Sequence, residues 1–571
     1  MSLTRQSYFF NLLRAFTMSY KTPNVYVEEQ AILPPSVAEV STAIPAFIGY
    51  TARAGANNEL KEKAVRISSL LAYQRHFGEA PLTHFDVKVN NQNVVEVKPK
   101  KTFDYFMYDC LRLYFANGGG DCYIVSVGNH QEKISKIAIE KGIDALEKED
   151  EPTLIVMTES ANLSTEDYGA LCQKVLMHCA TLKDRFAIFD AGENDIDQVK
   201  TFREKIGTDN LKYGAAYFPY LTTNLGYHYS DDSVEVTGIS DPRTQIGHYS
   251  SGDNGLLVTY TGNQNDAPKI KISKHTDAEE KSISVVPNNS FVLEITIPKT
   301  GASAKDIVAI WNGLSDKKQF NMENQGTGVD MITQEITSPQ ALTYASDAPS
   351  ATREKLSKLK SNKTALYNQI RTKIDNERLT LPPSAAIAGV YARIDRERGV
   401  WKSPANVSLN DVIGPTLKIT DQQQENLNVD ATAGKSINAI RSFTGKGTVV
   451  WGARTLAGND NEWRYISVRR LFNLIEESLQ KSTTFAVFEP NNAMTWLKVR
   501  TMAQSYLDDL WRKGALAGAT PEEAYFVKAD RGQTMTEQDI LEGKLIVEIG
   551  VAAVRPAEFI VLRFAHKLQQ A

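Results

Sequence analysis

Apolar positions recur with helical spacing between residues 103 and 115. They stand at i, i+3, i+4, i+7, i+8 and i+11, as Phe103, Phe106, Met107, Cys110, Leu111 and Tyr114. This spacing gathers them on one face of an amphipathic helix. Three glycines at 118–120 then end the helix, and an apolar strand follows at 122–127. A second helix is predicted over residues 65–80.

The same alternation of buried strand and amphipathic helix continues along the chain. Ser164, followed three residues later by Asp167, resembles a capping box at the start of a helix over 164–181. Further strands are predicted at 46–50, 154–157, 186–190 and 215–217, and a further helix at 199–206. Strands that alternate with helices are typical of a layered α/β domain.

From about residue 222 the pattern changes to short alternating strands separated by Gly, Asn and Asp. In residues 291–297 every odd position is apolar, which predicts a half-buried strand. The strand at 233–236 is assigned to the same region. We therefore expect an inserted β-rich domain over 222–350, followed by a long charged helix over 353–377 with one apolar stripe.

Two helices and a strand are predicted in the last third of the chain, at 468–479, 496–511 and 545–551. Their apolar residues fall on single faces, and Gly514 follows the second helix as a stop signal. Arg555 and Pro556 separate this part from a final apolar strand, which consists of Phe559, Ile560, Val561, Leu562, Arg563 and Phe564.

The beginning of the chain also carries a strand that is detached from the core. It consists of Val25, Tyr26, Val27 and Glu28, with Pro23 before it and Pro34 and Pro35 after it. An isolated strand must find a sheet edge to satisfy its backbone N–H and C=O groups. That edge belongs either to the same chain or to a neighbouring copy, and the sequence leaves this choice open.

Together these patterns predict a multidomain α/β (α+β) protein whose core is built from N- and C-terminal parts. Its expected segments are a flexible extension (1–20), an N-terminal arm (21–35), an α/β domain (36–221), the β-rich insertion (222–350), a helical connector (351–380), a C-terminal core domain (381–555) and a C-terminal arm (556–571).

Composition excludes several classes of protein. The chain has 571 residues, 42% of them hydrophobic and 23% charged, as in soluble globular proteins. A net charge of −4 gives no basic footprint for nucleic acid. No stretch reaches the length of a membrane span, and the first 17 residues lack a signal-peptide cleavage site. The four cysteines are too few for a disulfide framework, which fits synthesis in the cytoplasm.

No motif indicates a cofactor, a metal or a catalytic residue. Gly434, Lys435 and Ser436 resemble the end of a phosphate-binding loop, but Val429 stands where the leading glycine should be. The eight histidines show no metal-ligand spacing. His178 and Cys179 are neighbours on a helix and so point about 100° apart, which argues against a nucleophile pair.

Two stretches carry a specific resemblance. Residues 22–29 (TPNVYVEE) and 40–51 (VSTAIPAFIGYT) open the first, and residues 382–406 (PPSAAIAGVYARIDRERGVWKSPAN), 438–441, 450–456 and 465–471 form the second. In order and spacing they resemble contractile tail sheath proteins of phages and phage-tail-like injection systems. The family often has Gly at the position of Asn24. The resemblance covers roughly residues 20–220 and 380–571 and does not extend to the insertion.

The resemblance implies a structural subunit that polymerises helically around an inner tube. Each subunit's two terminal arms would add strands to a neighbour's core sheet, and a metastable extended lattice would contract to drive the tube through an envelope without a nucleotide. Implied partners are further copies in stacked six-subunit rings, the inner tube protein, baseplate and cap proteins and a paralogous sheath subunit, with no nucleic acid and no membrane insertion. The insertion would face outward.

Several alternatives stay open at this stage. Charge alone suggests Lys498, Arg500, Arg512 and Lys513 as tube contacts. The charged run 395–398 is either a solvated loop or a set of register-fixing contacts in a polymer. The competing functions are an α/β enzyme of hydrolase type with a β insertion, and a non-contractile structural component of the same particle. The source is equally open: a phage tail, an extracellular injection particle or a membrane-anchored cytoplasmic system.

Overall fold

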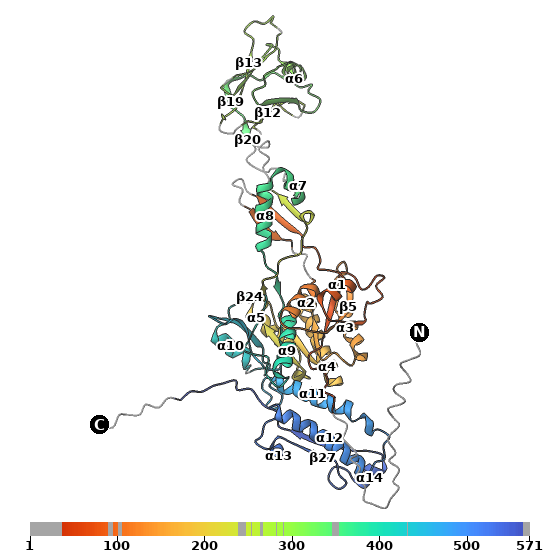
Figure 1. The fold of residues 1–571 in the computed structure, drawn as a ribbon. Coiled ribbons are helices and arrows are strands. Elements are labelled where there is room, and N and C mark those ends of the chain that lie inside the picture. Colours follow the sequence, from red (N-terminus) through yellow and green to blue (C-terminus); the bar gives the residue numbers. More distant parts are fainter. Residues whose placement is uncertain are drawn as a thin grey trace, which may run out of the picture. The chain divides into compact units, whose positions relative to one another are not determined.

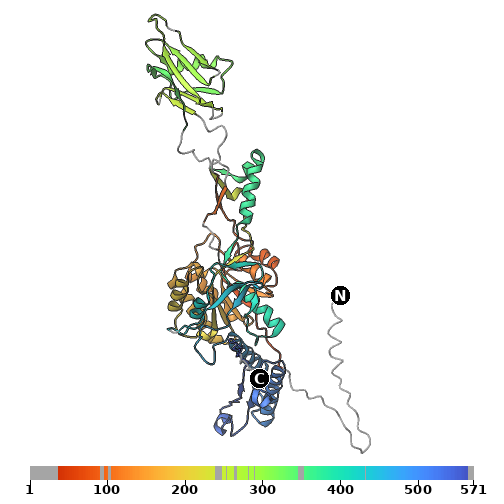
Figure 2. The same ribbon diagram turned by 90° about the vertical axis from the view of Figure 1, so that its left-hand side faces the viewer.

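The structure is a computed structural model. It describes residues 37–89, 95–100, 105–237, 247–252, 254–262, 266–280, 282–288, 290–344, 353–430 and 432–563. The chain divides into two compact units (Figures 1 and 2). The C-terminal unit contains Leu474–Val554 with the described residues 37–40, and the main unit contains Ser41–Asn473 with the segment that begins at Arg555.

A nine-stranded central sheet organises the main unit. Its order is β2-β5-β1-β6-β7-β8-β25-β26-β23. The six strands from β5 to β25 are parallel, β2 and β26 run opposite to them, and β23 pairs antiparallel with β26. The strands are β1 (Pro45–Thr51), β2 (Ala64–Ile67), β5 (Cys122–Asn129), β6 (Leu154–Met157), β7 (Phe186–Asp190), β8 (Gly214–Phe218), β23 (Val407–Ser408), β25 (Asn438–Phe443) and β26 (Gly447–Trp451). All residues of β1, β6, β7 and β8 are buried, as in sheets that are covered on both faces.

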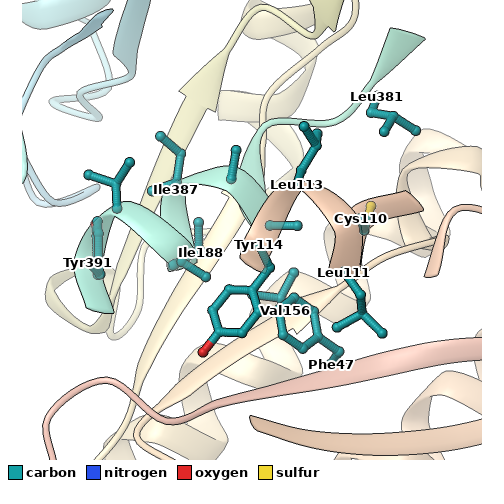
Figure 3. Close-up of a cluster of buried hydrophobic side chains, with 14 of the residues drawn as sticks. Phe47, Cys110, Leu111, Leu113, Tyr114, Val156, Ile188, Leu381, Ile387 and Tyr391 are labelled. Atoms are coloured by element: carbon teal, nitrogen blue, oxygen red, sulfur yellow. The ribbon is translucent and has the colours of Figure 1, made fainter. Parts of the chain in front are cut away.

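Helices cover both faces of this sheet. The first face packs against α1 (Leu70–Phe77), α2 (Met107–Ala116) and α9 (Ser384–Arg398), and Figure 3 shows side chains of α2 and α9 meeting Phe47, Val156 and Ile188 of the strands. The second face packs against α3 (Lys136–Ala145), α4 (Thr165–Leu182), α5 (Ile196–Lys205) and α10 (Asp421–Asn428). The predicted layered α/β core is confirmed.

Two helix predictions need correction at their starts. The stretch 65–80 is not one helix, because residues 64–67 pair with β5 and α1 begins only at Leu70, with Ser69 as its N-cap. The helix expected from residue 103 begins at Met107. The Ser164 cap is confirmed, since its Oγ accepts a hydrogen bond from Asp167 N at 3.2 Å.

Helices α2 and α9 pack closely at Gly389. A Cβ atom there would lie 2.5 Å from the carbonyl oxygen of Tyr114 on α2, so only glycine allows this approach. Further along α9, the hydroxyl of Tyr391 lies 2.8 Å from that of Tyr217 on β8. The two N- and C-terminal parts of the sequence therefore share one core.

A buried carboxylate fixes the start of α2. Glu159 follows β6, and its Oε1 accepts hydrogen bonds from Phe106 N (2.9 Å) and Met107 N (2.8 Å), while Oε2 accepts from Tyr50 N on β1 (3.0 Å). The Thr158 hydroxyl lies 2.5 Å from Oε2. Complete burial raises the pKa of Glu159 to about 7, against the lowering effect of these donors.

Asp190 at the end of β7 fixes the start of α9 in the same manner. Its Oδ1 accepts from Ser384 N at 2.8 Å, and its Oδ2 lies 2.7 Å from the Ser384 hydroxyl. Burial raises the pKa of Asp190 to about 7 as well. Helices α2 and α9 therefore each begin at a buried carboxyl group that follows or ends a strand of the central sheet.

A smaller sheet of order β21-β10-β3-β4 combines distant segments. It contains β3 (Phe85–Val89), β4 (Val95–Pro99), β10 (Val234–Thr237) and β21 (Glu354–Lys355), and it shares a core with α7 (Leu356–Asn362) and α8 (Thr364–Asn376). The strand at 233–236 thus pairs with β3 and not with the insertion. The single helix predicted over 353–377 is two helices that meet at Lys363, where Ser361 and Asn362 are poor helix formers.

The inserted region forms a β domain with its own core around Trp311. One sheet contains β11 (Gly247–Ser250), β12 (Leu256–Tyr260), β17 (Phe320–Asn324) and β20 (Thr343–Tyr344); the other contains β13 (Lys269–Lys274), β14 (Ser284–Pro287), β15 (Val292–Ile297) and β19 (Ile336–Ala341). Helix α6 (Ala304–Asn312) has Ser303 as its N-cap, and β16 (Ala302–Ser303) pairs with β18 (Met331–Ile332). Strands β9 (Leu221–Thr223), β22 (Thr380–Leu381) and β24 (Val412–Pro415) form a separate small sheet.

The C-terminal unit combines helices with one small sheet. Its elements are the second half of α11 (Ile466–Ser482), α12 (Ala493–Arg512), α13 (Pro521–Ala524), β27 (Tyr525–Lys528), α14 (Glu537–Leu541) and β28 (Glu548–Val551). The predicted apolar faces of α11 and α12 are largely buried, but Phe472 and Trp511 are half-buried and Leu497 is exposed. Of the described helices, none combines the length and the apolar character that a bilayer crossing requires.

Candidate assembly surfaces

The sheet of the C-terminal unit has only two strands. β27 and β28 pair antiparallel, from Tyr525 opposite Val551 to Lys528 opposite Glu548. Within the described part of the chain no third strand pairs with either of them. Within the described residues each strand therefore has one edge without a strand partner, which is the geometry that accepts an added strand.

One face of this two-stranded sheet rests on the unit's own helices, and the other is open. Val527 is buried on the inner side, next to α12, whereas Phe526 and Lys528 are exposed. A Cβ atom at Gly550 would lie 2.2 Å from the Phe526 ring, so the ring lies directly across the neighbouring strand. An isolated two-stranded sheet is marginally stable in water, and this one leaves an aromatic side chain uncovered.

The C-terminal arm, in contrast, is an apolar segment that pairs with no strand among the described residues. Residues 555–563 form no helix or strand, and Phe559, Ile560, Val561 and Leu562 are between 71% and 80% exposed. Four consecutive exposed apolar side chains are unusual on a soluble protein and mark an interaction segment. Phe564 lies outside the described residues, as do Val25, Tyr26, Val27 and Glu28 of the N-terminal arm.

The root of this arm is held at Glu558. Its Oε2 accepts hydrogen bonds from Arg454 Nη2 (2.7 Å) and the Tyr465 hydroxyl (3.1 Å), and its Oε1 accepts from Arg454 Nε (3.0 Å) and Asn428 Nδ2 (2.7 Å). We call these four residues the Glu558 clasp. Burial opposes ionisation of the carboxylate, but hydrogen bonds from Arg454 and Asn428 prevail and hold the pKa of Glu558 below its ordinary value.

The four cations proposed as tube contacts have different surroundings. Arg500 pairs with Asp530, Arg512 with Asp508 (2.8 Å), and Lys513 with Asp509 (2.7 Å) and Glu39 (3.3 Å). Lys498 is exposed and forms no ion pair with a described residue. Lys498 is thus the one of the four whose charge has no acidic partner within the described chain.

The charged run 395–398 belongs to the end of α9 and is not a loop. Asp395 forms a buried ion pair with Arg470, with 3.0 Å between Oδ1 and Nη1, and also accepts a hydrogen bond from the Thr42 hydroxyl at 2.6 Å. At least this member of the run joins α9 to other elements of its own subunit.

The residues that suggested enzyme chemistry serve structural contacts. Lys435 Nζ donates to Arg203 O, and the Ser436 hydroxyl donates to Asn428 O at 2.6 Å. Burial lowers the pKa of His178 to about 4 and raises that of the Cys179 thiol well above its ordinary value. Among the described residues no cluster of His, Cys, Asp and Glu has the geometry of a metal site.

Comparison with known proteins shows similarity to phage tail sheath proteins. Residues 321–456 match the phage tail sheath protein central domain, and residues 458–567 match the phage tail sheath C-terminal domain. The tail sheath protein of Enterobacteria phage T4 is 32% identical over 128 residues, which is 22% of this chain and 19% of that protein. The chain thus spans only about a fifth of the length of this relative.

Two solved structures extend the likeness to the full chain. The sheath complex of the extracellular contractile injection system PVC, in its contracted state, is 26% identical over 97% of this chain and 99% of that one, with a TM-score of 0.54. The contracted helical sheath of the anti-feeding prophage is 27% identical over 96% of this chain and 100% of that one, with the same TM-score.

Two adjoining segments of the chain therefore match domains of phage tail sheath proteins, and almost the whole chain is similar to contractile sheath structures. These relatives are structural proteins of assembled tails or tail-like particles, not enzymes. The matched C-terminal domain of the sheath family includes both the two-stranded sheet and residues 555–563 of the C-terminal arm.

The Glu558 clasp is not apparent from the sequence. Arg454 lies inside one of the family-like stretches, yet its partner is 104 positions away. The only local signal is an arginine within the largely apolar stretch 449–456, because a buried arginine requires a carboxylate or carbonyl partner. Nothing in the sequence around Glu558 marks that residue as the partner.

Proposed function

We propose that the chain is the subunit of a contractile sheath, which polymerises helically around an inner tube in a metastable extended state and contracts to drive the tube through a target envelope. The observation that carries this proposal is the likeness, over 97% of the chain, to a sheath that was captured after contraction. Stacked six-subunit rings, baseplate and cap proteins and a paralogous subunit complete the proposed particle.

The links of the lattice are the terminal arms. Each arm adds a strand to the two-stranded sheet of another copy, one at the free edge of β27 and one at that of β28. The central sheet is a poorer acceptor, because its edge strands are the four-residue β2 and the two-residue β23. Short edge strands are a common protection against strand addition.

Strand addition also accounts for the exposed apolar residues on both sides of the contact. Main-chain hydrogen bonds provide affinity, each worth about 1 kcal/mol net, and alternate side chains of Phe559–Leu562 select the register. Many such contacts in one lattice hold subunits together while the segments between arm and core bend. Subunits can then rotate during contraction without separating.

The β domain formed by described residues between 247 and 344 faces outward, and α12 contacts the tube through Lys498. The two-sheet domain has a closed core of its own, which suits an appended position. Exchange of Lys498 for Glu is expected to weaken co-assembly with the tube protein. Exchange of Arg500 for Glu, by contrast, breaks the pair with Asp530 and lowers the stability of the C-terminal unit.

Deletion of the arms tests the proposed function. Removal of residues 1–32 or of residues 556–571 is expected to leave a folded, soluble subunit and to abolish tubular assembly in electron micrographs. Deletion of residues 247–344 serves as the control, because it removes a domain of greater length that should not carry the lattice. Normal tubes from either arm deletion would contradict the proposal.

A further inference from the structure

The covalent origin of the C-terminal arm and its point of attachment lie in different units. The chain leaves the C-terminal unit at Val554, whose N–H still donates to Ala515 O at 3.2 Å. Arg555 and Ala557 are exposed, and Glu558 then enters the clasp on the main unit. From Phe559 onward the described residues are exposed again. Glu558 is therefore a single fixed point between two exposed stretches.

Arg454, which binds Glu558 in the clasp, is itself held in place by several hydrogen bonds. The Arg454 side chain is 5% exposed, and its Nη1 donates to Asn428 O at 3.1 Å. Its backbone is bound on both sides by the Asn438 side chain, which accepts from Arg454 N (2.8 Å) and donates to Arg454 O (2.8 Å). Asn438 is the first residue of β25, and its amide also donates to Ala216 O on β8 at 3.2 Å. A continuous set of hydrogen bonds therefore leads from Glu558 into the central sheet.

The hydrogen bonds around the Glu558 carboxylate have the features of a strong contact. They combine a two-point arginine–carboxylate pair, which fixes geometry as well as charge, with two neutral donors on the same carboxylate. The Glu558 side chain is 21% exposed and Arg454 is almost fully buried. Loss of the carboxylate would leave the guanidinium in a desolvated place without its counter-charge, which is costly.

We propose that the Glu558 clasp fixes the root of the C-terminal arm on the main unit, so that force on an arm bound to a second copy reaches the central sheet and not the two-stranded sheet. The inference rests on the proposed function in one respect, that the arm engages another copy. Glu558 is a positioning residue in this arrangement. A fixed root lowers the entropic cost of placing residues 559–563 on a neighbour, because fewer chain conformations must be lost on binding.

Spin labelling combined with assembly assays tests the clasp. Cys110, Cys122, Cys172 and Cys179 are all buried, so a nitroxide at A557C reports selectively on the arm root. We expect a restricted label in the parent chain and a mobile label after Glu558→Gln, together with loss or shortening of the tubes. The thermal midpoint of the unassembled subunit reports separately on the fold. Asp421→Asn is the matched control, because it removes an exposed partner of Arg441 on the same unit and should change neither readout.

A second truncation separates the clasp from the arm. Deletion of residues 559–571 keeps Glu558, and the label at position 557 should remain restricted while tubes are lost. Normal tubes from this truncation would overturn the arm proposal itself. Normal tubes from Glu558→Gln, alongside loss in the truncation, would overturn only the clasp. Should Glu558→Gln prevent folding, Tyr465→Phe removes a single hydrogen bond, and an unchanged label mobility in that folded variant would overturn the clasp as well.

Discussion

The central sheet and the two-stranded sheet differ in whether their own chain completes them. Nine strands and seven helices, drawn from both halves of the chain, bury the central sheet on both faces. Among the described residues no third strand pairs with β27 or β28, and Phe526 is exposed. The described chain thus buries the first sheet on both faces, whereas the second sheet is the one to which, in the proposed lattice, strands from another copy add. Substitutions in the central sheet should therefore affect the stability of the subunit, and substitutions in the two-stranded sheet should affect assembly.

The largest difference is expected between two matched phenylalanine truncations. Phe47 on β1 is fully buried, and Phe47→Ala should lower the free energy of unfolding by about 3–5 kcal/mol. Phe526 is 44% exposed, and Phe526→Ala should cost the isolated subunit under about 1 kcal/mol but reduce tube formation. Chemical denaturation and negative-stain counts measure the two effects. Equal losses of stability would remove the contrast between the sheets.

The pH dependence of stability should belong to the central sheet. Burial raises the pKa of Glu159 from 4.5 and that of Asp190 from 3.8, each to about 7. The folded subunit then binds protons more tightly than the unfolded chain, so this stabilisation is present at low pH and is lost as pH rises through about 7. Between about pH 4 and about pH 8 this corresponds to about 3 kcal/mol for Glu159 and about 4 kcal/mol for Asp190.

The Glu159→Gln variant measures how much of this pH dependence comes from Glu159. The slope of unfolding free energy against pH should flatten in this variant, although its absolute stability falls because the amide NH₂ meets backbone donors. Denaturant titrations at several pH values give the slope. An unchanged slope would mean that Glu159 stays ionised, held by its three backbone N–H donors.

Disruption of the close packing between α2 and α9 should lower the stability of the subunit by a smaller amount. Gly389→Ala places a methyl group 2.5 Å from Tyr114 O, and we expect a loss of about 1–3 kcal/mol despite the better helix propensity of alanine. Gly120→Ala is the control, since a Cβ atom there meets open space. Similar thermal midpoints for both variants would show that the helices can separate at no cost.

The smallest effect on stability is expected for Lys498→Glu on α12. With no acidic partner among the described residues, its reversal should leave the unfolding free energy within about 0.5 kcal/mol while it weakens tube co-assembly. Sedimentation of mixed sheath and tube protein measures the second effect. Unchanged co-sedimentation would exclude Lys498 as a contact.

Periodicity predicted the central sheet because its elements obey local rules. Strands such as 186–190 are continuously apolar and α4 begins at a serine cap, so their type follows from neighbours in sequence. The break at Lys363 and the pairing of β10 with β3 were missed, because they depend on partners about 150 residues away or on a weak local preference.

The assembly surfaces were predictable only in part. Apolar residues after Pro556 indicated a detached strand, and the structure leaves residues 559–562 exposed without a sheet. The two-stranded sheet could not be recognised as an acceptor, since an edge is defined by which strand is absent. The Glu558 clasp joins residues more than 90 positions apart, a distance at which sequence patterns carry no signal.

Cross-linking between separately marked subunits tests most directly whether the arm completes the sheet of another copy. One population carries Val561→Cys, and a second carries Lys528→Cys on β27 or Glu548→Cys on β28. Mixed assembly followed by mild oxidation should give a covalent dimer for at least one of the two pairs, and the dimer should vanish when Val561→Cys is combined with Glu558→Gln. Assembled tubes without any mixed dimer, with a cross-link forming only inside a chain that carries both cysteines, would contradict the account.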